Sequence, residues 1–82
     1  MNFDFFPKQI DLHGLRTSEA ISTVLNALYE LENDSPNQNY LDIVVGVGTG
    51  ALRLSVEELL DNESYRYEFI NSNKSSIRVY KK

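Results

Sequence analysis

One stretch of the sequence limits the possible folds more than any other. Residues 40–45 form an almost unbroken apolar, β-branched run, and a glycine-rich turn at 46–50 follows directly. Apolar side chains then recur at helical spacing. A run of this kind is typical of a central, parallel strand that is covered on both faces. A strand that leads at once into a helix predicts an α/β fold.

Hydrophobic periodicity gives the remaining elements. Alternating apolar residues indicate strands, and apolar residues at i, i+3, i+4 and i+7 indicate amphipathic helices. We expect Thr17 or Ser18 to cap the first helix. The order βαβαββ predicts a single two-layer α/β domain in which both helices pack on a small mixed sheet. The predicted strands are 9–13, 40–45, 65–70 and 76–81, and the predicted helices are 17–33 and 51–62.

The size and composition of the chain restrict its class. With 82 residues and 41% hydrophobic content, we expect one domain at 10–82 after a lead-in at 1–9, as one part of a larger protein. The sequence has no cysteine, which excludes disulfides and thiolate zinc sites and suits the cytoplasm. No apolar window approaches the ~20 residues of a membrane span, so we expect no membrane partner.

Two polar residues interrupt the first predicted strand. The period of two places Asp11 and His13 together on one face, opposite Ile10 and Leu12. His13 is the only histidine, and imidazole is the side chain best suited to proton transfer near neutral pH. Asp11 would orient the ring or help to hold a divalent metal. Alternatively, His13 only caps the strand end through a hydrogen bond to Asp11.

The second candidate loop is the Gly-x-Gly-x-Gly turn. Glycines between a strand and a helix let several backbone N–H groups approach one anion, for which phosphate is the natural ligand. Arg53 would add a bidentate contact, or it pairs with Glu57 on a solvated helix face. The turn is not a P-loop, and the chain is too short for a complete dinucleotide fold. The predicted phosphate-binding residues are Gly46, Gly48, Thr49, Gly50, Arg53, Arg16 and Lys8.

The charges are unevenly distributed along the sequence. A net charge of −4 argues against a protein that coats nucleic acid non-specifically. The acidic residues gather toward the C-terminal ends of both predicted helices, where they oppose the helix dipole. The opposite pole is less acidic and can receive a phosphate backbone. Alternatively, the acids only keep a small domain soluble.

Taken together, the two loops resemble the Smr (small MutS-related) domain. The motifs that carry the resemblance are Asp-Leu-His-Gly-Leu-Arg at 11–16 and Gly-Val-Gly-Thr-Gly-Ala-Leu-Arg at 46–53. The second motif is most similar to the Smr domain at the C-terminus of the second bacterial MutS paralogue. The resemblance implies a fold similar to the C-terminal domain of translation initiation factor three. It also implies nicking of DNA or cleavage of RNA, with Asp11 and His13 as the family's Asp-x-His motif.

The sequence departs from this family at two places. Many relatives carry histidine or threonine directly before the glycine loop, where this chain has Val45. A polar segment, 71–76, replaces the glycine-rich turn that usually precedes the last strand. Both departures weaken the prediction of catalysis more than that of binding.

Three functions follow as hypotheses. The first is a phosphodiesterase in which the glycine loop and Arg53 hold the phosphate and His13 moves the proton, without metal on RNA and with Mg²⁺ or Mn²⁺ on DNA. The second is a non-catalytic module that binds DNA, RNA or the ribosome through the same pole. The third is a protein-interaction domain that uses Tyr65, Tyr67 and Tyr80 at a sheet edge, although such tyrosines are more often half-buried strand residues.

Overall fold

A computed structural model describes residues 9–82 of the chain. The predicted order βαβαββ is confirmed, and the strands are slightly shorter than the sequence patterns indicated. The elements are β1 (Gln9–Asp11), α1 (Thr17–Asn33), β2 (Tyr40–Val44), α2 (Ala51–Asn62), β3 (Arg66–Phe69) and β4 (Ser76–Tyr80).

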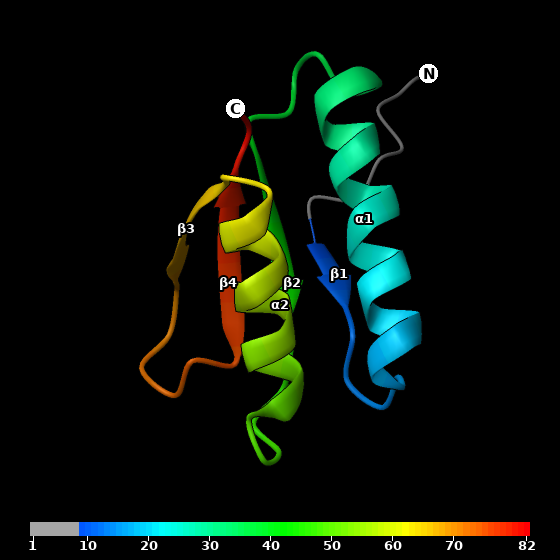
Figure 1. Cartoon of the computed structure of the whole chain (residues 1–82). Coiled ribbons are helices and arrows are strands. Elements are labelled where there is room, and N and C mark those ends of the chain that lie inside the picture. The colour runs from blue at the N-terminus through cyan, green and yellow to red at the C-terminus, as the bar shows by residue number, and fades with distance from the viewer. Residues whose placement is uncertain (1–8) are drawn as a thin grey trace, which may run out of the picture.

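The four strands form one mixed sheet in the order β1-β2-β4-β3 (Figure 1). β2 is central and parallel to β1, as predicted, and it is antiparallel to β4. β3 closes the sheet as the antiparallel neighbour of β4. Because β1 and β2 run in the same direction, their C-terminal ends meet at one edge of the sheet, where the following loops begin.

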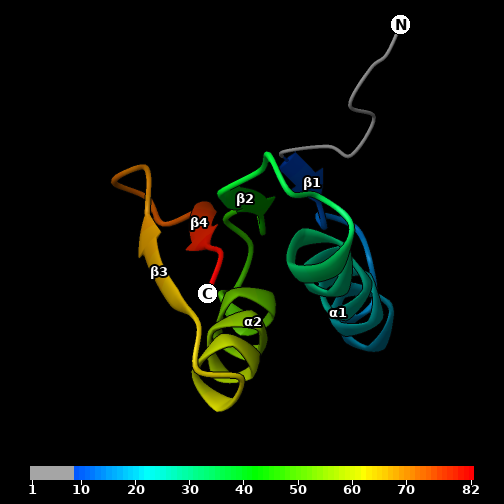
Figure 2. The ribbon, with the colours of Figure 1, turned by 90° about the horizontal axis from the view of Figure 1, so that it is seen from above.

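Both helices pack on the same face of the sheet (Figure 2), so the prediction that β2 is covered on both faces is wrong. Leu41 and Ile43 point into the helical layer and are buried, whereas Asp42 lies half-buried on the other face. There its carboxylate accepts two hydrogen bonds from Arg78 on β4, at 2.8 and 3.0 Å. The Asp42 charge is therefore paired on the face of the sheet that points away from both helices.

The core lies between the sheet and the two helices. Buried positions alternate along β2 and β4 and recur at helical spacing along α1 and α2, so each element contributes one face. The buried hydrophobic residues are Leu12, Ala20, Val24, Leu28, Leu31, Leu41, Ile43, Val45, Val56, Leu60, Ile77 and Val79.

The start of α1 differs from the prediction. Thr17 is the first helical residue, so the cap position falls on Arg16, and the prediction that Thr17 or Ser18 caps the helix is wrong. The Glu19 carboxylate accepts a hydrogen bond from the Arg16 backbone N–H at 3.0 Å. The carboxylate of Glu19 in the first turn therefore satisfies the backbone N–H of the cap residue, as in one half of a capping box.

The three tyrosines of the protein-interaction hypothesis do not form one exposed edge. Tyr65, Tyr67 and Tyr80 are half-buried, and Tyr80 lies on β4, which is an inner strand. Burial raises the pKa of Tyr65 and of Tyr67 to about 12. The hydroxyls of Tyr67 and Tyr80 donate to Asp61 and Glu68. These tyrosines have intramolecular roles.

Within residues 9–82, neither helix has the length and the apolar character that crossing a membrane requires.

Candidate functional site

The fold brings the two candidate loops to one edge of the sheet. β1 ends at Asp11 and β2 ends at Val44, and these two residues are paired in the parallel register. The Leu12 N–H continues the ladder by donating to the Val44 carbonyl at 2.8 Å. The chain then enters the turn before α1 on one side and the glycine loop before α2 on the other, so both helix N-termini lie at this edge.

A tight turn presents His13 at the end of β1. The Leu15 N–H donates to the Leu12 carbonyl at 3.1 Å, and Gly14 has a φ of +81°, a left-handed value that glycine adopts without strain. Leu12 enters the core, while the side chain of His13 is 73% exposed. The predicted separation of apolar and polar faces is therefore correct.

Asp11 and His13 form a hydrogen-bonded pair. The Asp11 carboxylate lies 2.7 Å from Nδ1 of His13 and also accepts the His13 backbone N–H at 3.0 Å. The hydrogen bonds from His13 lower the pKa of Asp11. The tautomer of His13 with the proton on Nδ1 satisfies this hydrogen bond to an ionised Asp11 and leaves Nε2 as an acceptor. The same contacts also fit the simpler role of a strand-end cap.

The glycine loop takes a backbone path that side chains would disturb. Gly46 and Gly50 have φ values of +79° and +87°, in the left-handed region. A Cβ atom at Gly46 would also lie 3.4 Å from Cβ of His13, so the two loops touch. Gly48 differs, because nothing lies within 4 Å of its Cβ position and its φ is outside this region. Its missing side chain leaves open space beside the backbone.

The first turn of α2 supplies hydrogen-bond donors next to this loop. The Thr49 hydroxyl accepts the Ala51 N–H at 3.3 Å and so occupies one of them. The N–H groups of the next residues have no partner within the helix, as at every helix start, and the positive end of the helix dipole lies there. An anion beside the loop would receive these donors.

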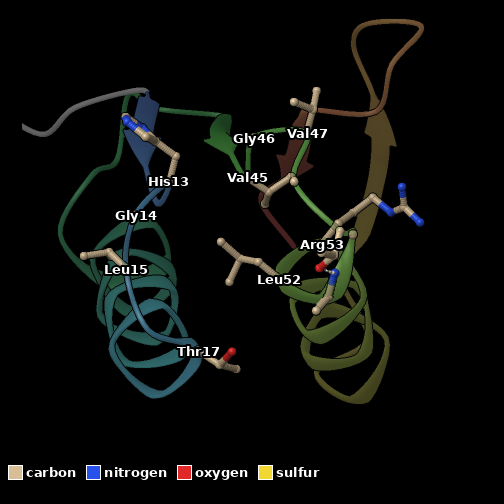
Figure 3. A pocket seen from close by; sticks show the side chains of 13 residues that line it. His13, Gly14, Leu15, Thr17, Val45, Gly46, Val47, Leu52 and Arg53 are labelled. Carbon is tan, nitrogen blue, oxygen red and sulfur yellow. Dashed lines mark hydrogen bonds between the residues drawn. The ribbon is translucent and has the colours of Figure 1, made fainter.

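His13 and the glycine loop line one hollow of about 580 Å³. Figure 3 shows His13 and Arg53 on opposite sides of it, with Leu52 between the two helices. The expectation that the two loops open onto a common hollow therefore agrees with the structure. The lining residues are His13, Gly14, Leu15, Thr17, Val45, Gly46, Val47, Gly48, Thr49, Gly50, Ala51, Leu52 and Arg53.

The predicted basic residues are placed unequally. Arg53 lines the hollow, and its Nε donates to the Glu57 carboxylate at 3.2 Å, so the alternative helix pair is present. A phosphate would bind the guanidinium through the N–H donors that Glu57 does not occupy. Arg16 precedes α1 and does not line the hollow, while Lys8 lies outside the described residues.

A supporting contact from the β3–β4 loop was not predicted. The Ser75 carbonyl accepts the N–H groups of Val45 and Gly46 at 2.8 and 3.2 Å, which fixes the start of the glycine loop. Asn71 holds Ser75 in turn: Oδ1 accepts the N–H groups of Ser75 and Ser76, and Nδ2 donates to the Ser75 hydroxyl at 2.8 Å. The polar segment that replaces the family's glycine-rich turn thus braces the site.

We expect Asn71→Ala to loosen the glycine loop. The variant removes three hydrogen bonds around Ser75 and should cost about 1 kcal/mol of unfolding free energy. Amide hydrogen exchange at Val45 and Gly46 should accelerate more than exchange in the helices. Asn73→Ala, which removes one bond to the same Ser75 N–H, is the matched control and should have a smaller effect. Unchanged exchange at Gly46 would contradict the bracing role.

The described residues offer few ligands for a metal ion. Within residues 9–82 no three His, Cys, Asp or Glu side chains gather in a way that could hold a cation. Asp11 and His13 supply two donors that already bind each other. A divalent cation would need water and substrate phosphate to complete its coordination shell, so we assign no step to one.

Several solved structures of Smr domains have a fold similar to that of this chain. The B3BP Smr domain has a TM-score of 0.79 at 23% identity and covers 92% of this chain and 78% of its own. The human small-MutS related domain has a TM-score of 0.76 at 24% identity, with 89% of this chain and 99% of its own covered. The Smr domain of Thermus thermophilus MutS2 has a TM-score of 0.74 at 29% identity, with coverage of 90% and 96%.

The sequence comparisons identify the family. No curated protein sequence matches the chain. The Smr domain family model matches residues 10–76. This match spans most of the chain and includes both loops of the site, so the chain belongs to the Smr domain family.

Proposed function

We propose that this chain is a nucleic-acid phosphodiesterase that cleaves RNA or nicks DNA. The observation that carries the proposal is the shared hollow: His13 lines one side, and a glycine loop at a helix N-terminus lines the other. Asp11 does not line the hollow and contacts it only through its hydrogen bond to His13. The imidazole ring points away from Val45 and Leu52 (Figure 3), so His13 would rotate to reach a phosphate that the loop binds. Membership in the Smr family supports the same chemistry.

On RNA, the proposed reaction uses only residues of the site and needs no cofactor. Nε2 of His13 would take the proton of the 2′-hydroxyl while Asp11 holds Nδ1. The 2′-oxygen then attacks the adjacent phosphorus and the bond from phosphorus to the 5′-oxygen of the next nucleotide breaks. That oxygen takes a proton from solvent water, so the products are a 2′,3′-cyclic phosphate and a 5′-hydroxyl. Backbone N–H groups of the loop and of the α2 start would stabilise charge on the non-bridging oxygens.

The identity of the product ends tests this proposal. Labelled single-stranded RNA and branched DNA should be incubated with the protein, with and without a chelator. A cyclic phosphate that forms in the presence of chelator supports the RNA reaction. Chelator-sensitive nicks in DNA with 5′-phosphate or 3′-phosphate ends would assign the activity to a divalent cation, Mg²⁺ or Mn²⁺, that the substrate helps to bind.

Val45 favours a second function, which is binding without cleavage. Its side chain is buried in the core and lines the bottom of the hollow, so no polar group comes from this position. A non-catalytic module would bind RNA, DNA or ribosomal RNA through the same loops. Its affinity for nucleic acid would fall as the salt concentration rises, because about one counterion is released per phosphate contact. No cleavage product would form.

We expect Gly48→Ala to weaken nucleic-acid binding without unfolding the domain. The new methyl group meets no protein atom within 4 Å, so the unfolding free energy should change by less than about 0.5 kcal/mol. It would, however, stand where the loop approaches a phosphate, and affinity for a labelled oligonucleotide should fall about tenfold.

Gly50→Ala is the contrasting variant, because its φ of +87° makes any side chain strained. It should lower the unfolding free energy by about 1–2 kcal/mol. Fluorescence anisotropy and thermal unfolding of both variants separate the two effects. If Gly48→Ala bound the oligonucleotide as tightly as the wild type does, the loop would not hold the phosphate.

A further inference from the structure

The helical layer carries a groove on a face that the proposed reaction does not use. α1 and α2 lie side by side on one face of the sheet (Figure 2), and a groove of about 360 Å³ runs between them. Ile21 and Leu25 line it from α1, and Leu59 lines it from α2. Leu25 is 44% exposed.

More apolar surface continues beside the groove. Tyr29 lies one helical turn after Leu25 on the same side of α1 and is 66% exposed. On α2, Leu54 is 58% exposed and adjoins Ser55 and Glu58, which line the groove. Exposed apolar side chains that gather around a groove indicate a docking surface, whereas single scattered ones do not.

The charge around the groove determines the kind of partner. α1 and α2 together contain six acidic side chains and one basic one, Arg53, which pairs with Glu57. Glu58 and Glu63 line the groove itself, and in the described part of the chain neither forms a salt bridge. No basic residue lies in the last turn of either helix, where it would balance the dipole.

We propose that this groove binds a basic amphipathic helix of a partner protein. The apolar side of such a helix would cover Leu25 and Leu59, and its lysines or arginines would meet Glu58, Glu63 and the negative end of the α2 dipole. A nucleic acid would be repelled from this face. A second copy of the chain would bring the same acidic helices against it, so self-association through the groove is disfavoured.

This interface would leave the proposed reaction accessible. The hollow beside His13 lies at the loop ends of the strands, whereas the groove follows the sides of the helices. Among residues 9–82, Thr17 alone lines both. The partner would therefore tether the domain without covering the glycine loop. The proposal does not depend on whether the hollow catalyses cleavage.

The test uses a synthetic peptide of about 16 residues, long enough to form a helix, with leucines at i, i+4 and i+7 and lysines elsewhere. We expect it to bind the intact domain and to shift the backbone amide signals of Ser55, Leu59 and Leu25. A peptide with glutamate in place of lysine should not bind. Absence of binding by the lysine peptide, or shifts confined to the sheet, would overturn the proposal.

Paired variants separate specific docking from general attraction. Leu25→Ser and Glu58→Lys should each weaken the lysine peptide about tenfold. Ile70→Ser alters a side chain of similar exposure (42%) outside the groove, and Glu30→Lys makes the same charge change as Glu58→Lys, but on α1 and outside the groove. Both should leave the affinity for the lysine peptide unchanged. Equal losses in the control variants, or a dimer in sedimentation that Leu25→Ser abolishes, would overturn the assignment of a basic partner.

Discussion

Replacing His13 by alanine should lower the rate of RNA cleavage by about 10²–10⁴-fold, which is the usual contribution of a general base. The side chain is 73% exposed and does not belong to the core, so its removal should change the unfolding temperature little. Binding of an uncleavable RNA, with a 2′-deoxy substitution at the scissile position, should stay close to that of the wild type. The loss would then lie in the chemical step.

Asp11→Asn is the companion variant. The amide oxygen can still accept a hydrogen bond from Nδ1, but the negative charge that supports the developing imidazolium is lost. We expect a reduction no larger than in His13→Ala, about 10²–10⁴-fold at most, again with unchanged binding. Full cleavage by His13→Ala would remove the imidazole from the mechanism, and equal loss of binding and cleavage would make it a phosphate ligand.

The element order could be read from the sequence because each segment shows one clear period. Helical spacing in α1 and α2 and alternation in β4 match the faces that are buried in the structure. The coverage of β2 was predicted wrongly, because the β-branched run was given more weight than the one charged residue in it. Asp42 has a matching charge in Arg78, and this pair occupies the face that no helix covers.

Part of the site was also readable from local spacing. Asp11 and His13 are two residues apart on one strand, so their pairing follows from strand geometry alone. That their hollow also contains the glycine loop depends on the parallel pairing of β1 and β2, which a crossover between consecutive strands favours.

Other contacts of the site could not be read from the sequence. Ser75 reaches Val45 and Gly46 only because β4 pairs antiparallel with β2 in a register that sets Val44 opposite Ser76. A polar linker alone does not reveal this register. Arg53 also remained open, because one side chain at one helical position serves a phosphate and Glu57 equally well.

Truncating Ile43 to alanine should leave much of the protein unfolded at 37 °C. Ile43 is completely buried in the central strand, opposite Ile10 on β1 and Ile77 on β4. Buried isoleucine-to-alanine changes cost about 2–5 kcal/mol, and a domain of this size has only about 5 kcal/mol of stability in total. Urea unfolding followed by circular dichroism measures the loss directly.

The neighbouring residue provides the control for this change. Val44→Ala also shortens a β-branched side chain of β2, but Val44 is half-buried on the face that no helix covers, so its cost should stay below about 1.5 kcal/mol. Ile43→Val should cost about 0.5–1.5 kcal/mol. Because β2 leads directly into the glycine loop, oligonucleotide binding should decline in the order of these stability losses. Equal destabilisation by Val44→Ala and Ile43→Ala would mean that both faces of β2 are packed alike, contrary to the two-layer fold.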